Sequence, residues 1–89
     1  MKIKDGLRLR KLGRRYMLVR TTAERADMSE VFTFNETAAF IFEKALEAGQ
    51  VDAEALVNSM TEEYEVDEDI ARRDIMAILD EWKNNGIVE

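Results

Sequence analysis

The sequence predicts an α+β domain in which a three-stranded antiparallel sheet is followed by a bundle of three helices. Apolar and polar residues alternate in short stretches up to residue 34, and from residue 35 onward apolar residues recur with helical spacing. The chain has 89 residues, of which 46% are hydrophobic, which suits one modest core. We therefore expect a single domain over residues 1–89, with the sheet in 1–34 and the helices in 35–89.

The first two strands are expected to form a hairpin. Leu7 and Leu9 alternate with two arginines, and the turn residue Gly13 separates them from a run rich in strand formers at 16–20. The polar stretch 21–27 has no periodicity, so we expect a loop there.

The third strand is expected at 28–34, where the alternation resumes. Neighbouring side chains of a strand point to opposite faces, so Phe32 and Phe34 are expected to face the core together. Val31 and Thr33 then lie on the other face.

The first helix is expected to begin at Asn35, whose side-chain oxygen can accept hydrogen bonds from the free amides of the first turn. Gly49 is expected to end this helix. Its apolar positions recur at intervals of three and four residues, which predicts one buried face made of Ala38, Ile41, Phe42, Ala45 and Leu46. Phe40 lies opposite that face, and we expect it to pack under the polar loop rather than to contact a partner.

Asp52 and Asp67 are expected to cap the second and third helices. The second helix fades after Tyr64, and the cluster of Asn84, Asn85 and Gly86 ends the third. The predicted buried positions are Ala53, Leu56, Val57, Met60 and Tyr64 in the second helix and Ala71, Ile75, Ile78, Leu79 and Trp82 in the third. Ile87 and Val88 form an apolar tail that could fold back onto the core. This order of elements resembles a winged helix.

The composition argues against an enzyme. Cys and His are both absent, which removes thiol nucleophiles, imidazole bases and the usual zinc ligands. The acidic run at 66–74 lacks the glycine that a calcium-binding EF-hand loop needs, so helix capping is the better interpretation and no cofactor is expected. The basic start of the chain has no apolar run after it, and no segment reaches transmembrane length, which predicts a soluble cytoplasmic protein.

Charge is distributed unevenly. Residues 1–20 carry eight basic residues against one acidic residue, whereas residues 21–89 carry five against eighteen. The basic hairpin could dock a small structural subunit onto an acidic partner, or its arginines, Arg8, Arg10, Arg14 and Arg15, could form a solvated face. DNA binding is a further alternative, but the second helix has no Lys or Arg to meet phosphate.

Several motifs together resemble the PqqD family, the prototype of the RiPP recognition element. They are F-N-E-T-A-A-F-I-F at 34–42, the stop at Gly49, D-I-x-x-I-L-x-x-W at 74–82 and the closing G-I-V. The resemblance covers nearly the whole chain, with Phe34 and Phe42 standing where the family usually has Leu and Trp. It implies a winged-helix-like, non-catalytic module that binds the leader segment of a precursor peptide and presents it to a modifying enzyme, often a radical SAM protein.

The resemblance also implies where the peptide binds, as a strand added beside the third strand, in a groove whose other wall is the third helix. We expect the strand to contribute Ser29, Glu30, Val31, Phe32 and Thr33. An exposed strand edge offers unpaired backbone groups to a guest, although the same edge could pair with a second copy in a homodimer.

Two flanks of the third helix could face this groove. One carries Arg72, Met76 and Lys83 beside Leu79, and the other carries Ile70, Asp74, Ala77 and Glu81. We expect the first flank, because an exposed methionine with two cations suits a leader with apolar and acidic anchors.

Overall fold

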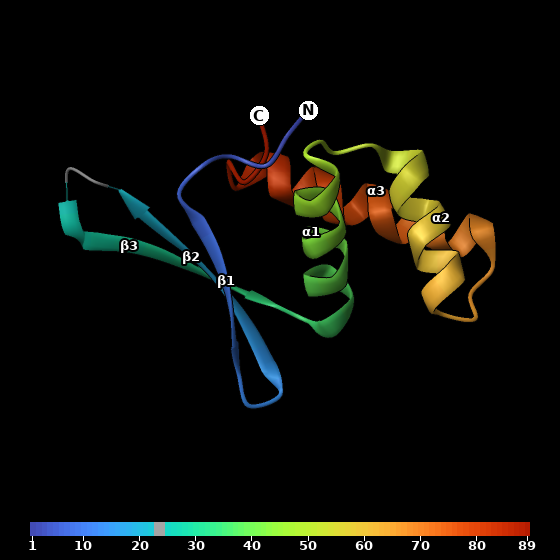
Figure 1. Ribbon diagram of the computed structural model, residues 1–89, viewed down its shortest axis with the longest axis horizontal. Helices are drawn as coiled ribbons and strands as arrows, with labels where there is room; N and C mark the ends of the chain where they lie inside the picture. Colours follow the sequence, from blue (N-terminus) through green and yellow to red (C-terminus); the bar gives the residue numbers. More distant parts are fainter. Residues whose placement is uncertain (23–24) are drawn as a thin grey trace.

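The predicted α+β class is confirmed, with three antiparallel strands followed by three helices (Figure 1). The computed structural model describes residues 1–22 and 25–89, with side chains described outside 21–30. The elements are β1 (Leu7–Leu12), β2 (Arg15–Thr22), β3 (Arg25–Phe34), α1 (Glu36–Ala48), α2 (Ala53–Glu63) and α3 (Glu68–Asn84).

The sheet has the order β1-β2-β3, so β1 and β3 are its edges. The predicted loop at 21–27 is wrong, because β2 continues to Thr22 and β3 already begins at Arg25. In Figure 1 this end of the β2–β3 hairpin projects away from the helices. Apolar residues alternate along a strand only where one of its faces is buried. The paired ends of β2 and β3 lie beyond the helices, so their sequence shows no such alternation.

Helix boundaries follow the predicted capping residues closely. The Asn35 side-chain oxygen Oδ1 accepts a hydrogen bond from the Ala38 amide at 2.8 Å, and Gly49, with φ of 74°, ends α1. Asp52 caps α2 by accepting from the Glu54 amide at 3.1 Å. Asp67 occupies the predicted N-cap position of α3, but its side chain makes no capping hydrogen bond, which corrects that part of the prediction.

Replacing Asn35 with alanine is expected to lower the free energy of unfolding by about 1 kcal/mol, because an amide of the first turn of α1 loses its acceptor. For a domain of this size the melting temperature should fall by about 4–8 °C in thermal unfolding followed by circular dichroism. The matched control is Asn58→Ala at an exposed position inside α2, where alanine improves helix propensity. Equal melting temperatures for the two variants would show that the cap contributes nothing.

The core is centred on three aromatic rings, one each from β3, α1 and α3. Phe34 stacks on Trp82 with ring centroids 5.6 Å apart, and Phe42 meets both rings edge-on at 5.8 and 5.7 Å. Most predicted core positions are buried, but Leu46 is 51% exposed and Ala39 takes a buried place instead. Ala53, Tyr64 and Ile78 are only partly buried against the core.

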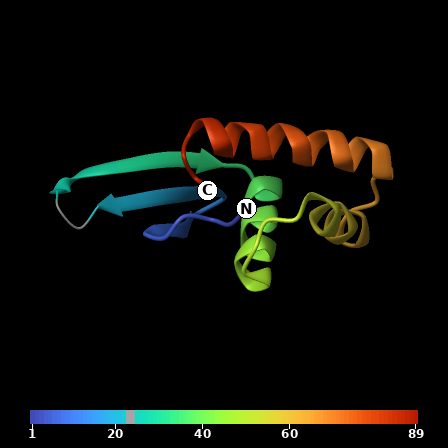
Figure 2. The same cartoon turned by 90° about the horizontal axis from the view of Figure 1, so that it is seen from above.

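The predicted return of the C-terminal tail is confirmed. Ile87 and Val88 are buried, and Val88 pairs with Ile3 in an antiparallel bridge. Lys2 and Glu89 exchange two backbone hydrogen bonds of 2.9 Å, and Figures 1 and 2 show the two chain ends side by side. The tail therefore fixes the C-terminal end of α3 to the start of the chain. Within residues 1–22 and 25–89, no helix combines the length and apolar character needed to cross a membrane.

Phe40 is partly buried against the core, and its described contacts lie at the end of α2 and on α1. Its ring meets Tyr64 edge-on at 5.6 Å, and the Lys44 ammonium lies 5.6 Å from the ring centroid. The predicted contact with the side chains of the 21–27 loop lies outside the described residues. Burial, with the nearby charge of Glu36 as a smaller cause, raises the pKa of Tyr64 above its ordinary value.

Candidate functional site: a groove beside the third strand

The free edge of β3 is the first component of the site. β3 pairs with β2 on one side, and among the described residues no strand pairs with its other side. Val31 is 49% exposed and Thr33 is exposed, whereas Phe34 is buried in the core. The last part of β3 is thus held by its inward side chains while its outer edge stays open, which is the condition for adding a further strand.

A cavity of about 810 Å³ lies between this edge and α3. Figure 2 shows β3 and α3 on the same side of the molecule, with β1 on the other side. The lining residues are Arg14, Arg15, Val31, Phe32, Thr33, Phe34, Asn35, Glu36, Ala38, Ile78, Glu81, Trp82, Asn85 and Ile87. We call this cavity the β3–α3 groove.

The apolar part of the groove belongs to the aromatic core. The stacked rings of Phe34 and Trp82 line it, and Ala38 of α1 leaves room because its side chain is a single methyl group. Ile78 is half-buried and forms part of the helical wall. An open strand edge next to an apolar surface can bind an extended peptide through its backbone and select among its side chains.

Arg20 fixes the distance between the sheet and the end of α3. Its guanidinium donates hydrogen bonds from Nη2 to the carbonyl oxygens of Asn85, at 3.1 Å, and Gly86, at 2.5 Å. The same guanidinium lies 5.7 Å from the centroid of the Phe32 ring. A cation at the C-terminal carbonyls of a helix is electrostatically favourable, so Arg20 stabilises the wall of the groove. The sequence interpretation missed this role. Arg20 lies two residues after the buried Leu18, so the side chains of both point to the same face of β2.

The residues predicted on α3 lie elsewhere. Arg72, Met76, Leu79 and Lys83 are not among the residues that line the β3–α3 groove. Leu79 is buried at 5% exposure, and Met76 is exposed on the flank that also carries Arg72. The groove instead meets the opposite flank through Ile78, Glu81 and Asn85.

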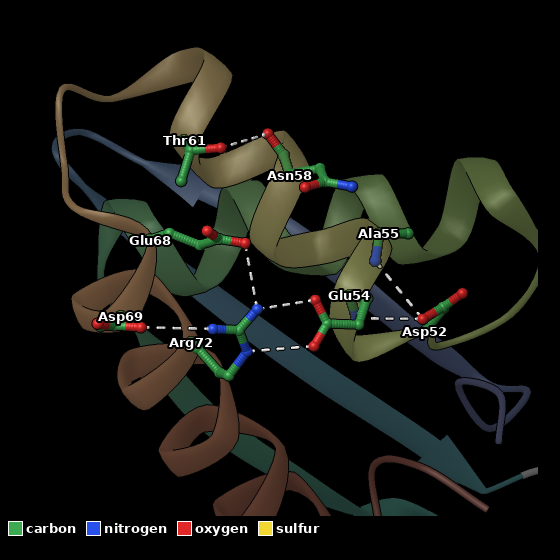
Figure 3. A network of polar contacts seen from close by, with 8 residues as sticks. All are labelled: Asp52, Glu54, Ala55, Asn58, Thr61, Glu68, Asp69 and Arg72. Atoms are coloured by element: carbon green, nitrogen blue, oxygen red, sulfur yellow. Dashed lines mark hydrogen bonds and ion pairs between the residues drawn. The ribbon is translucent and has the colours of Figure 1, made fainter.

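Arg72 has a structural role between α2 and α3 (Figure 3). Its Nε and Nη2 atoms donate to the two carboxylate oxygens of Glu54 at 3.1 and 3.0 Å, and Nη2 also donates to Glu68 at 3.2 Å. Asp69 lies 3.6 Å from Nη1. The hydrogen bonds and the charge of Arg72 lower the pKa of Glu54, and Glu54 in turn raises the pKa of Arg72. Acids of the first turn of α3 thus pair with this arginine.

Val31, Phe32 and Thr33 do line the groove, as part of β3. Ser29 and Glu30 belong to the same strand, and Glu30 pairs with Arg20 of β2, but the side chains of both lie outside the described residues. The structure therefore brings the predicted strand positions 31–33 to the groove, with a different set of helical residues facing them.

Replacing Glu54 with glutamine should make the thermal stability of the protein less dependent on pH in the acidic range. The folded state holds the pKa of Glu54 below its ordinary value, so its contribution is present above that ordinary value and is lost as the pH falls through the lowered pKa. At pH 7 and low salt, E54Q should melt at a slightly lower temperature than the unmodified protein, and the difference should vanish near pH 2 and shrink in salt, since the pair is exposed. The control is E62Q, at an exposed position of the same helix. A difference between E54Q and the unmodified protein that persists at pH 2 would exclude the ion pair as its cause.

Comparison with known proteins places the chain among proteins of the same architecture. A solved structure of TbiB1 in complex with the TbiA(beta) leader peptide matches with a TM-score of 0.79 at 21% identity, covering 100% of this chain and 95% of that one. Lasso peptide synthetase B1 complexed with the leader peptide matches with a TM-score of 0.76 at 24% identity, covering 99% and 95%. At these identities the likeness establishes the fold.

The comparison with curated protein sequences found no match. The family described as coenzyme PQQ synthesis protein D (PqqD) matches residues 11–88. This match spans β2, β3, all three helices and the returning tail, and so includes both walls of the groove. The chain belongs to the PqqD family.

Proposed function

We propose that this chain is a peptide-binding module that takes up the leader segment of a ribosomally synthesised precursor peptide as a strand beside β3. The observation that carries the proposal is the open edge of β3 bordering a groove with an apolar floor of Phe34 and Trp82. The two solved structures compared above are both complexes with leader peptides. A guest strand would extend the sheet from three strands to four and cover the groove.

The module acts without catalysis and presents the bound peptide to a modifying enzyme, such as a radical SAM protein, in the cytoplasm. Support comes from the sequence, which has no Cys or His to act as nucleophile or general base near neutral pH. Support also comes from the makeup of the groove, whose floor is apolar and whose polar lining side chains are arginines, asparagines, glutamates and a threonine.

The residues that we expect to contact the guest peptide are those that line the groove. On the strand side they are Val31, Phe32 and Thr33, continued by the backbone of Ser29 and Glu30. On the helix side we now favour Ile78, Glu81 and Asn85 over the flank predicted from the sequence, because these residues line the cavity.

A scan of the guest backbone tests strand addition without altering the protein. Peptides encoded by short reading frames next to the gene would be synthesised, and binding would be measured by fluorescence anisotropy, with micromolar or tighter dissociation constants expected. In the best binder, methylating single backbone nitrogens should weaken binding by roughly tenfold at alternate positions and little at those between, because only every second amide of a strand faces its neighbour. If the loss of affinity on methylation did not alternate from one guest residue to the next, strand addition would be contradicted.

Pairing of β3 with a second copy would use the same edge as the guest. Any homodimer formed through this edge should therefore dissociate when a bound peptide is added, which analytical ultracentrifugation measures. A dimer that persists with the groove filled would have to use a different surface.

A further inference from the structure

Two arginines stand at one end of the β3–α3 groove. Arg14 lies in the β1–β2 turn and Arg15 begins β2. Arg15 directly precedes Tyr16, which pairs with Phe34, so the turn lies beside the end of β3 and the start of α1. Both arginines are exposed, and both line the groove. The sequence interpretation had placed them on a solvated face or in a separate docking surface.

Among the described residues, none neutralises these two guanidinium groups. Arg72 is paired with Glu54, Glu68 and Asp69, but within the described part of the chain neither Arg14 nor Arg15 forms an ion pair or a side-chain hydrogen bond. Their charges are therefore available to a ligand.

The surroundings leave this end of the groove positive. Of the two carboxylates that line the groove, only Glu36 also lines an adjoining hollow of about 230 Å³, which it shares with Lys11 and Arg14. Three cations thus face one anion. The other carboxylate of the groove, Glu81, belongs to the wall formed by α3.

We propose that the guest peptide of this groove carries an acidic side chain that pairs with Arg14 and Arg15 and stands at a fixed offset from an apolar side chain seated on Phe34 and Trp82. The proposal rests on the proposed function, since it assumes a guest strand beside β3. Guanidinium groups bind carboxylates through charge-assisted hydrogen bonds, often two at a time. Pairing with β3 fixes the register of the guest, so the offset between the two anchors is the same in every bound peptide.

A display selection tests this without knowledge of the natural guest. Random twelve-residue peptides, fused at their C-termini so that only side chains supply carboxylates, would be selected on the unmodified protein, on the double variant R14E/R15E and on the control R8E/R10E. The control reverses two exposed arginines of β1 that do not line the groove and changes the net charge equally. Melting curves should agree closely among the three proteins, since all four arginines are exposed.

The unmodified protein and the control should both enrich Asp or Glu at one offset from an apolar residue, and R14E/R15E should enrich Lys or Arg there. The best peptide should bind R14E/R15E roughly tenfold more weakly than the control in fluorescence anisotropy. Changing the acidic residue of this peptide to the matching amide should weaken its binding to the unmodified protein. This test alters only the peptide and needs no protein variant.

Two outcomes would overturn the proposal, and they differ in what they say of the function. Selection of apolar peptides with no preferred carboxylate, or of the same peptides by all three proteins, would overturn the acidic anchor and leave strand addition intact. Selection of no peptide at all would overturn the proposed function together with the anchor.

Discussion

Replacing Trp82 with alanine is expected to lower the free energy of unfolding by about 3–5 kcal/mol, the range found for removing a large aromatic side chain from a core. Trp82 is 2% exposed, and its ring contacts Phe34 of β3 and Phe42 of α1. The substitution would open a cavity where three elements meet. Domains of this size have total stabilities of about 5–15 kcal/mol, so much of the margin would be lost.

Urea unfolding followed by circular dichroism measures this loss, because the substitution removes the single tryptophan that fluorescence would follow. Trp82→Phe keeps a ring in the stack and should cost clearly less. Ile70→Ala changes an exposed residue of the same helix and should leave the midpoint nearly unchanged. If Trp82→Ala unfolded at the same urea concentration as Ile70→Ala, the aromatic cluster would not be what joins β3 to α3.

Local features of this fold could be predicted from the sequence because their causes are local. Asn35 and Asp52 cap their helices through amides two or three residues further on, and Gly49 ends α1 through its own backbone conformation. The alternation at 28–34 placed Phe34 correctly, since a strand with one buried face must alternate. These predictions needed no knowledge of what the elements pack against.

The groove depends on contacts that the sequence does not encode locally. Arg20 donates to Asn85, which is 65 positions away along the chain, and no pattern in either segment signals that contact. Both flanks of α3 border the same buried stripe, so periodicity could not decide which one faces β3. The two-pronged partner of Arg72, Glu54, comes from α2 and could not be predicted locally, whereas its pairing with Glu68, four residues earlier, has a spacing that the sequence does show. Arg14 and Arg15 seemed to be solvated because only the sheet register brings their turn to the end of β3.

Replacing Val31 with proline is expected to weaken leader binding by at least about tenfold while the domain stays folded. Proline has no backbone N–H, and its ring obstructs the edge on which a guest strand would pair. Each backbone hydrogen bond contributes roughly 0.5–1.5 kcal/mol net. Losing the donor of Val31 and distorting the neighbouring acceptor should therefore together raise the dissociation constant of the guest peptide by more than about tenfold. Fluorescence anisotropy with the peptides described above measures the loss, and melting curves establish that the variant is folded.

Lys11→Pro provides the matched control on the opposite edge. Lys11 of β1 pairs with Tyr16, and Val31 of β3 pairs with Val19. The two-residue turn at 13–14 makes Leu12 and Arg15 a hydrogen-bonded pair, so every second residue of β2, counted from Arg15, directs its backbone groups toward β1. By this alternation the amides of Lys11 and Val31 both point away from β2.

The two prolines should therefore affect stability in the same direction. Because Lys11 adds positive charge beside the groove, each proline variant is compared with alanine at the same position, and only Val31→Pro should bind more weakly than its alanine counterpart. A folded Val31→Pro variant that binds as tightly as Val31→Ala would mean that the guest uses the groove without pairing to β3.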